Sequence, residues 1–458
     1  FQILADRGVY ERKQRLFYQM RHDGLRRLNK PGPWAADQHL PLVDMNIGDL
    51  KPFWSAQVFG GSRMCDFTAL RQQQQDVTES ASDYHDFELR HFSNYRLQME
   101  RAIDAMLLRG RGILKVTVDP YNNYALTFRS IDPLYLLMPQ QYDDFDDADY
   151  WIEVQTLSVP QYQRTRQYNQ AADVIGAIKG RKDFNFNSIE IDKQVREGIT
   201  HSTRDEEIIL WHLWERTAGG FTITTFSPQA TDKEIRKPYG CPYKVGGKTS
   251  VPFFSFTMEV KDEGWYAPRG IAELNAAFEA YACTLWNHKT DAMKFGNTPL
   301  FTSEKELPNS ANIRFNPGEF IPGNIKAVEM PQPAFSFDQE IGFARGIAEQ
   351  RARVPDFGIE DSSSAAKSGG KPRTATENNR IAGLQNVGAD YNGEIFRNCR
   401  LQKVYKHTWG LMCQFQRTRM TYFIGDDLKT LPVQALHDEY LVIPTGGPAN
   451  KNEKMGKA

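Results

Sequence analysis

Residues 361–373 read DSSSAAKSGGKPR and run directly into Thr374-Ala375-Thr376-Glu377 and then a long helical pattern. The Thr374 side chain can accept a hydrogen bond from the first helical turn, and Glu377, three residues on, can reach back to the cap, as in a capping box. The helical pattern continues to about Thr418, which corresponds to roughly 45 residues and about 67 Å. A basic, glycine-containing loop attached to so long a helix indicates a mechanical part of a protein rather than a catalytic pocket.

The composition excludes several classes of protein. At 458 residues the chain is long enough for two or three domains. Its 56 Lys and Arg residues balance 57 Asp and Glu residues, which argues against a protein that coats nucleic acid by bulk charge. The five cysteines are far apart and form no Cys-x-x-Cys pair, so we expect free thiols in a reducing compartment and no zinc site. No apolar run is long enough for a membrane span.

The first part of the chain mixes helical and strand patterns without the regular βαβ alternation of a doubly wound fold, so the sequence predicts an α+β fold. Helices are predicted over residues 1–30, 76–109 and 159–178. Strands are predicted over residues 113–118, 124–131, 134–138, 150–156, 208–215, 221–226 and 251–258.

After Pro268-Arg269-Gly270 the pattern changes to a helix that runs to about Phe295. It carries a heptad-like seam with spacings of 3, 4, 3 and 4, formed by Ile271, Leu274, Phe278, Tyr281 and Leu285. Residues 296–333 hold six prolines and short strand candidates, and a second helix is predicted over residues 337–353. Two helices around a β-rich insert predict a protruding docking element with apolar surface left for a neighbouring subunit. An ordinary helix–loop–helix in a core is the alternative.

Three motifs resemble catalytic signatures but lack their context. Gly246-Gly247-Lys248-Thr249 ends like a phosphate-binding loop, but Pro242 stands where a glycine is needed and a strand follows, which argues against ATP binding. Asp356-Phe357-Gly358 lacks the other kinase motifs. An acidic cluster could supply carboxylates to a two-metal nuclease, but adjacent aspartates favour a solvated loop; the cluster comprises Asp143, Asp144, Asp146, Asp147 and Asp149. We therefore predict no catalytic residue, metal ligand or cofactor.

The loop at the start of the long helix carries three cations, Lys367, Lys371 and Arg373, among Ser, Ala and Gly residues. Such a loop suits transient contact with DNA phosphates without base reading. An ordinary solvated loop is the alternative for a monomer.

Taken in order, these parts resemble a bacteriophage portal protein (head–tail connector) of the podovirus type. The resemblance rests on four stretches. They are AMLLRGRGILKVTVDPYNNYALTFRSIDPLYLLMP at Ala105–Pro139, PRGIAEL at Pro268–Leu274, RARVPDFG at Arg351–Gly358 and TATE at Thr374–Glu377. Family members also carry a C-terminal helical crown, whereas only about 40 residues follow the long helix here. We therefore expect a crown that is short or missing.

The resemblance implies a division of the chain into seven parts. These are an α/β wing over residues 1–269, a first stem helix over 270–295, a β-rich clip over 296–336, a second stem helix over 337–358, a tunnel loop over 359–373, a long kinked helix over 374–418, and returning wing strands with a tail over 419–458. In this scheme Lys367, Lys371 and Arg373 touch DNA, while Thr374 and Glu377 anchor the tunnel loop.

The resemblance also implies a function without catalysis. Portal proteins form a closed homo-oligomeric ring, usually of twelve subunits, at one vertex of the virion capsid, after assembly in the host cytoplasm. Double-stranded DNA is packaged through the ring by terminase and is later ejected through it, and the implied partners include the major capsid protein and a tail adaptor. Two other classes stay open: another head–tail adaptor or tail-hub protein, and a metal-dependent nucleic-acid enzyme built on Asp143–Asp149.

Overall fold

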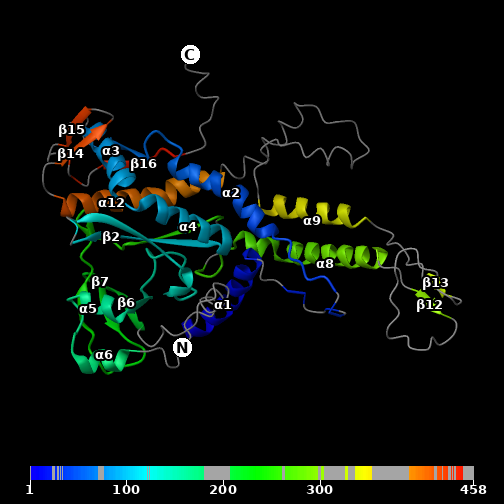
Figure 1. Ribbon diagram of the computed structural model, residues 1–458. Coiled ribbons are helices and arrows are strands. Elements are labelled where there is room, and N and C mark those ends of the chain that lie inside the picture. Colours follow the sequence, from blue (N-terminus) through cyan, green and yellow to red (C-terminus); the bar gives the residue numbers. More distant parts are fainter. Residues whose placement is uncertain are drawn as a thin grey trace, which may run out of the picture.

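The chain folds into a body of mixed helix and sheet from which two long helices project, as the computed structural model shows (Figure 1). Helix and strand are mixed throughout the body, consistent with the α+β class that the sequence predicts. The structure describes residues 2–22, 26, 27, 30, 32, 33, 35–70, 77–120, 122, 124–179, 207–259, 264–297, 301–303, 325–327, 336–352, 391–416, 420–424, 427–431, 435, 437 and 440–446.

The body contains most of the helices. They are α1 (Gln2–Arg21), α2 (Leu42–Phe59), α3 (Thr78–Phe87), the π-helix η2 (Glu88–Phe92), α4 (Tyr95–Arg109), the 3₁₀ turn η3 (Pro133–Tyr135), α5 (Val159–Arg164), α6 (Ala172–Ile178), the π-helix η6 (Phe396–Leu401) and α12 (Gln402–Phe415). The projecting helices are α8 (Ile271–Asn297) and α9 (Phe337–Ala352), which we call the stalk.

Two antiparallel sheets form the centre of the body. The larger has the order β4-β5-β6-β7-β8 and the smaller the order β11-β2-β3. The strands of the larger sheet are β4 (Leu136–Leu137), β5 (Tyr150–Ser158), β6 (Glu207–Thr217), β7 (Gly220–Phe226) and β8 (Arg236–Gly240). Those of the smaller sheet are β11 (Phe253–Thr257), β2 (Arg111–Asp119) and β3 (Ala125–Ile131). The sequence predicts all of these strands except β8, whose residues RKPYG show no alternation of apolar and polar side chains.

Four further strand pairs occur among the described residues. They are β1 (Cys65–Ala69) with β16 (Tyr440–Pro444), β14 (Met420–Ile424) with β15 (Asp427–Leu431), β9 (Lys244–Val245) with β10 (Lys248–Thr249), and β12 (Phe301–Ser303) with β13 (Ile325–Ala327). The pairing of Cys65 with Pro444 joins the first and last described strands of the chain. The pair β12–β13 lies at the far end of the stalk (Figure 1).

Two large hydrophobic cores hold most of the body together. The larger joins α2, α4, the three-stranded sheet, η6 and α12, and includes Trp54, Phe128 and Trp409. The smaller lies between the two sheets and is largely aromatic, with Trp151 and Trp214 stacked at 5.8 Å between ring centroids. Because both faces of the three-stranded sheet are covered, its strand β2 is buried along most of its length.

Several predicted helices differ from the structure. The helix predicted over residues 76–109 is interrupted at Ser93, whose backbone is extended. The Asn94 amide explains the break, because it donates to the Phe128 carbonyl and accepts from the Phe128 N–H, both at 2.9 Å. The Ser93 hydroxyl takes over part of the helical hydrogen bonding, since it donates to the Leu89 carbonyl at 2.8 Å and accepts from the Tyr95 N–H at 3.3 Å. The helix predicted over residues 1–30 ends at Arg21, and that over residues 159–178 is two short helices, α5 and α6.

The C-terminal long helix is described only in part. From Tyr391 to Phe415 the chain is helical, with the π-helix η6 inserted before α12. The predicted beginning of this helix, residues 374–390, lies outside the described residues. Over the described ranges, every helix is too short or too polar to cross a bilayer.

The stalk leaves the body at a close contact between two backbone segments. Gly110 ends α4 in the left-handed conformation, with φ of +89°. Gly270 precedes α8, and a Cβ atom there would lie 2.5 Å from the Leu108 carbonyl carbon and 2.6 Å from the Gly110 nitrogen. Any side chain at residue 270 would therefore push the start of α8 away from α4.

We predict that Gly270→Ala lowers the free energy of unfolding by about 1–3 kcal/mol, because the methyl group overlaps backbone atoms that cannot move independently. Gly48→Ala is the matched control, since nothing lies within 4 Å of a Cβ there and Ala favours a helix interior. Urea denaturation followed by circular dichroism measures both. Equal stability of Gly270→Ala and the parent would contradict the close contact.

Candidate functional site

The residues that the sequence predicts to touch DNA cannot be placed. The three cations and the two loop anchors lie outside the described residues; they are Lys367, Lys371, Arg373, Thr374 and Glu377. Of the predicted clip, the structure describes little beyond β12 and β13. Two described regions remain as candidate sites: the stalk and a charged pocket in the body.

The five seam residues on α8 do not form one exposed stripe. Ile271 and Leu274 are buried in the main core of the body, and Leu285 is also buried. Phe278 is half-buried, and only Tyr281 is largely exposed. The expectation that this seam is left free for a neighbouring subunit is therefore wrong for three of its five residues, because the chain covers them itself.

The two stalk helices pack against each other in opposite directions. Lys289 Nζ lies 2.6 Å from Asp338, near one end of the pair, while the Arg351 guanidinium lies over the Phe278 ring at 5.5 Å, near the other. Between these contacts the helices bury the small side chains Ala282 and Ala344. Exposed ion pairs contribute at most about 1 kcal/mol each, so close packing of small residues is the main attraction. The stalk is thus an antiparallel helical hairpin.

A ladder of polar side chains fixes the other side of α8. Every fourth residue of the helix accepts a hydrogen bond from a backbone N–H of residues 36–43. The four pairs are Asp291 with Ala36 at 2.6 Å, Asn287 with Gln38 at 2.8 Å, Cys283 with Leu40 at 3.3 Å, and Glu279 with Val43 at 2.7 Å. We call this set the polar ladder. Because these side chains satisfy its backbone, the segment can lie along a helix without joining a sheet.

Charge and burial strengthen the hydrogen bonds at the two ends of the polar ladder. Burial raises the pKa of Asp291, but the Ala36 hydrogen bond and the Arg27 guanidinium at 2.6 Å outweigh it, so the pKa lies below its usual value. Glu279 is fully buried and also lies 2.8 Å from His39 Nε2. The sequence alone did not predict this ladder. The signal was present as polar residues recurring every four positions, a helical spacing.

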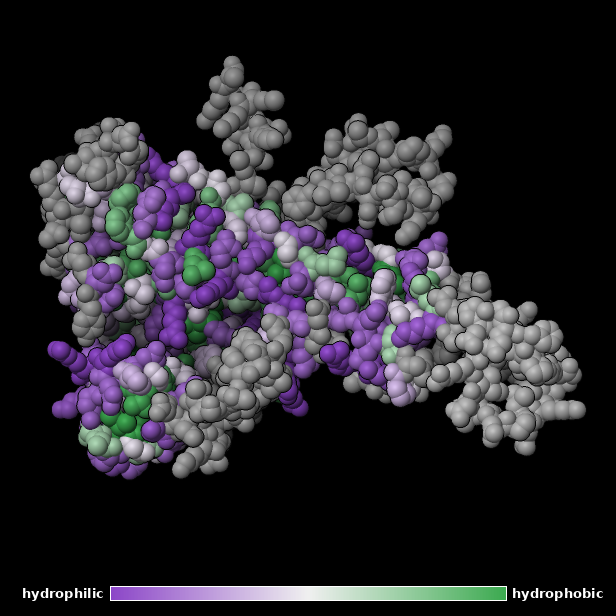
Figure 2. Space-filling view, in the orientation of Figure 1, coloured by the Kyte–Doolittle hydropathy of each residue, from purple (hydrophilic) through white to green (hydrophobic). Residues whose placement is uncertain are grey.

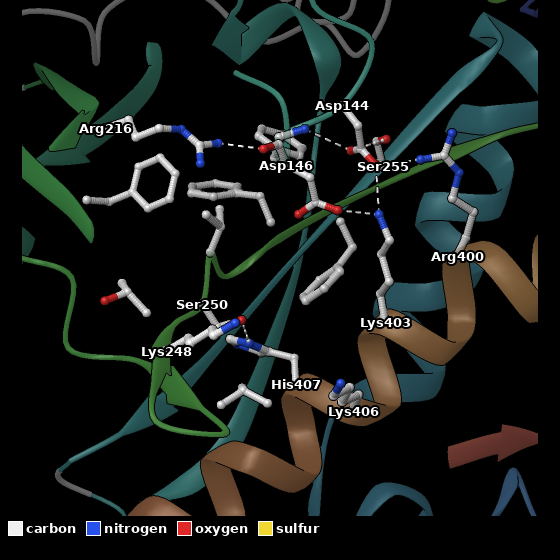
Figure 3. Close-up of a pocket in the computed structure, with 17 residues that line it drawn as sticks. Asp144, Asp146, Arg216, Lys248, Ser250, Ser255, Arg400, Lys403, Lys406 and His407 are labelled. Atoms are coloured by element: carbon white, nitrogen blue, oxygen red, sulfur yellow. Dashed lines mark hydrogen bonds and ion pairs between the residues drawn. The ribbon is translucent and has the colours of Figure 1, made fainter. Parts of the chain in front are cut away.

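A pocket of about 340 Å³ opens where the acidic loop before β5 meets the C-terminal helix (Figure 3). Its cations are Arg216 from β6, Lys248 from β10, Arg400 from η6, and Lys403 and Lys406 from α12. Its carboxylates are Asp144 and Asp146. These charged residues come from segments far apart in the sequence, so no local sequence motif predicts the pocket.

The acidic cluster is only in part the solvated loop that the sequence favours. Asp144 is largely buried, lies 2.6 Å from Arg400 and 3.5 Å from Lys403, and accepts a hydrogen bond from Ser255 at 2.9 Å. Asp146 pairs with Lys403, and Asp143 lies 3.4 Å from Arg111. Within the described ranges, no group of three or more His, Cys, Asp or Glu side chains could hold a metal ion. These three carboxylates therefore form ion pairs with cations on other helices and strands of the protein.

The titratable groups of the pocket are tuned by burial and charge. Burial lowers the pKa of Lys403, but its hydrogen bond to Asp146 and the charges of Asp144 and Asp146 outweigh that effect and raise the pKa. Burial lowers the pKa of His407 to about 3, so this imidazole is neutral at physiological pH. Its Nδ1 lies 2.8 Å from the Ser250 hydroxyl. A group with so low a pKa is a weak general base.

The Gly-Gly-Lys-Thr motif borders the same pocket. Gly246 and Gly247 have φ of +57° and +75° and form the tight turn between β9 and β10. Lys248 and Thr249 therefore lie on the short strand β10, and the strand β11 follows, as the sequence predicts, in place of the helix of a phosphate-binding loop.

A buried Cys–His pair elsewhere in the body is not suited to catalysis. Cys65 Sγ lies 3.3 Å from His85 Nδ1, and His85 Nε2 lies 2.7 Å from the Thr408 hydroxyl. Burial raises the pKa of the thiol well above its usual value and lowers that of the imidazole to about 3. The thiolate that a nucleophile needs is thus disfavoured, and all three side chains are closed to solvent.

We predict that Asn287→Ala lowers the free energy of unfolding by about 1–3 kcal/mol, because the Gln38 N–H and carbonyl both lose their partner on α8. His288→Ala, at the next residue on the exposed side of α8, should change it by no more than about 0.5 kcal/mol. Chemical denaturation compares the two. Equal effects of the two substitutions would show that the polar ladder adds no stability.

No known family model matches this chain, and no curated protein matches it. Its function must therefore be inferred from the residues and geometry described above.

Proposed function

We propose that this chain is the subunit of a bacteriophage portal ring, the channel for genome packaging and ejection at one capsid vertex and the docking site for terminase and tail adaptor. The observation that carries the proposal is the antiparallel hairpin of α8 and α9, which projects from an α+β body and ends in the β12–β13 pair (Figure 1). The order of these parts along the chain is the order expected for a portal subunit. The body corresponds to the wing, α8 and α9 to the two stem helices, and the β12–β13 pair to the clip between them.

The way the stalk is held supports a mechanical role. Ile271 and Leu274 root α8 in the main core, and the polar ladder holds residues 36–43 along it. A helix fixed by core contacts and by satisfied buried hydrogen bonds is held rigidly. The fixed helix then presents β12 and β13 at a defined distance from the body.

The stalk also presents apolar side chains to solvent. Tyr281, Met293 and Phe343 are 45%, 57% and 65% exposed. Figure 2 shows hydrophobic side chains over α8 and α9 among the hydrophilic ones that cover most of this face. In a cyclic ring, each subunit offers two different faces to its neighbours, so such side chains would be covered in a head-to-tail contact.

The charge distribution suits a channel through which DNA slides. The net charge of the chain is −1, so the subunit as a whole does not attract DNA strongly. Lys367, Lys371 and Arg373 would supply a few weak, sequence-independent phosphate contacts from the proposed tunnel loop. Repeated around a ring, these cations would line one constriction.

We predict that the purified protein forms rings with a DNA-wide central hole in negative-stain electron micrographs, and that Phe343→Asp shifts it toward monomers. A charge placed on α9 would lose its water if a neighbour covered it. Leu97→Asp is the matched control, since Leu97 is 56% exposed on α4, away from the stalk. A parent protein that stays monomeric at all concentrations in light scattering would contradict the proposal. Rings with a hole too narrow for DNA would favour another head–tail structural protein.

We predict that replacing Lys367, Lys371 and Arg373 together by Ala preserves ring assembly but reduces DNA packaging or retention, with a larger defect at low salt, where phosphate contacts are strongest. The control replaces Arg164, Arg166 and Lys237 by Ala, because these cations are exposed on the body. Packaging assays with nuclease-protected DNA measure the effect. Parental packaging and retention by the triple variant at both low and high salt would show that the loop is only a connector.

A further inference from the structure

The charged pocket of the body has more positive than negative side chains. Five cations face two carboxylates, Asp144 and Asp146. Figure 3 places Arg216 and Lys248 across the pocket from Lys403 and Arg400, with Ser250 and His407 between them at one end. Since the cations come from β6, β10, η6 and α12, no single helix or loop accounts for their gathering.

The contacts within the pocket leave part of this positive charge unpaired. Arg400 and Lys403 are held by the two carboxylates, and Arg216 donates to the backbone carbonyls of Asp146 at 2.5 Å and Ala148 at 3.1 Å. Backbone carbonyls do not neutralise the Arg216 charge. Lys248 and Lys406 are exposed, and neither has an ion-pair partner among the described residues.

We infer that this pocket binds the phosphate group of an organic phosphate. Lys248, Lys406 and Arg216 supply the charge, and the Thr249 hydroxyl is a neutral donor at the same wall. A phosphate carries three strong acceptor oxygens and up to two charges, so it can engage several converging donors at once, whereas a carboxylate offers two oxygens and one charge.

The shape of the pocket indicates that the phosphate carries a further group. Its volume of about 340 Å³ lies within the range of small-molecule sites. Val245, Val251 and Phe254 contribute an apolar wall beside the cations. A sugar or ring attached to the phosphate could pack there, so a nucleotide unit fits the combination of charge and apolar surface. This inference does not rest on the proposed function, because the pocket lies in the body and not on the stalk.

A nucleotide unit can come from two sources, a free nucleotide with a phosphomonoester or a nucleic-acid strand with phosphodiesters. The two share the same phosphate chemistry in the pocket. Calorimetric titration of the full-length protein would therefore use four probes in low-salt buffer: inorganic phosphate, a nucleoside monophosphate, a short oligonucleotide without terminal phosphates, and an acidic peptide that offers carboxylates only.

The key variant is Lys248→Ala with Lys406→Ala, which removes two exposed charges and leaves the Asp144–Arg400 pair intact. The control is Lys179→Ala with Lys237→Ala, two exposed lysines outside the pocket. We expect the parent and the control to bind at least one phosphate probe with equal affinity, and the pocket variant to bind it about 10-fold more weakly or worse. Thermal unfolding should give the same midpoint for all three proteins.

The pattern across the probes distinguishes the outcomes. Binding of the monophosphate but not the oligonucleotide assigns a free nucleotide, and the reverse assigns a nucleic-acid backbone. The inference is overturned if no phosphate probe binds, if the pocket variant binds as tightly as the control, or if the acidic peptide alone depends on Lys248 and Lys406.

Discussion

The structure depends on one place where two backbone segments touch without a side chain between them. Gly110 ends α4 with a positive φ, and Gly270, at the start of α8, lies so close that a Cβ would overlap the Gly110 nitrogen and the Leu108 carbonyl. A third glycine, Gly112, lets β2 approach the backbone of α4 at Ala102. The body and the stalk are thereby joined through α4, and the direction of α8 is set by backbone packing.

Buried polar contacts stabilise the junction of α4, β2 and α8 that the glycines allow. Arg111 stands between Gly110 and Gly112 and is almost fully buried; it donates to the carbonyls of Trp265 and Asp143 at 3.0 Å and stacks on the Trp265 ring. It thus links the start of β2 to the segment that leads into α8. Farther along the stalk the polar ladder takes over, with a hydrogen bond at every fourth residue. Leaving such groups unpaired inside the protein would cost more than their hydrogen bonds contribute, so these contacts define one arrangement.

The two candidate sites use charge in different ways. Asp144 and Asp146 join the loop before β5 to η6 and α12, because their cations come from a segment more than 250 residues later in the chain. The same helix presents Lys406 to the pocket, and the π-helical turn of η6 sets where Arg400 points. Irregular π-turns occur often at functional sites, since they shift side chains relative to a regular helix. On the stalk, by contrast, the charged groups pair with each other, as Lys289 does with Asp338, and a few large apolar side chains are exposed among polar ones.

The sequence by itself determined the local elements, and only the tertiary structure decided the surfaces. Most strands of the two sheets and the helices α8 and α9 follow from periodicity and turn chemistry, which act over a few residues. The break at Ser93-Asn94 did not follow, because Asn94 exchanges hydrogen bonds with a strand 34 residues away. The seam residues Ile271, Leu274 and Leu285 read as a surface for a neighbour, yet the chain covers them itself. The charged pocket and the polar ladder were likewise hidden from a linear pattern, since each exists only where segments distant in sequence meet and satisfy one another's charges and hydrogen bonds.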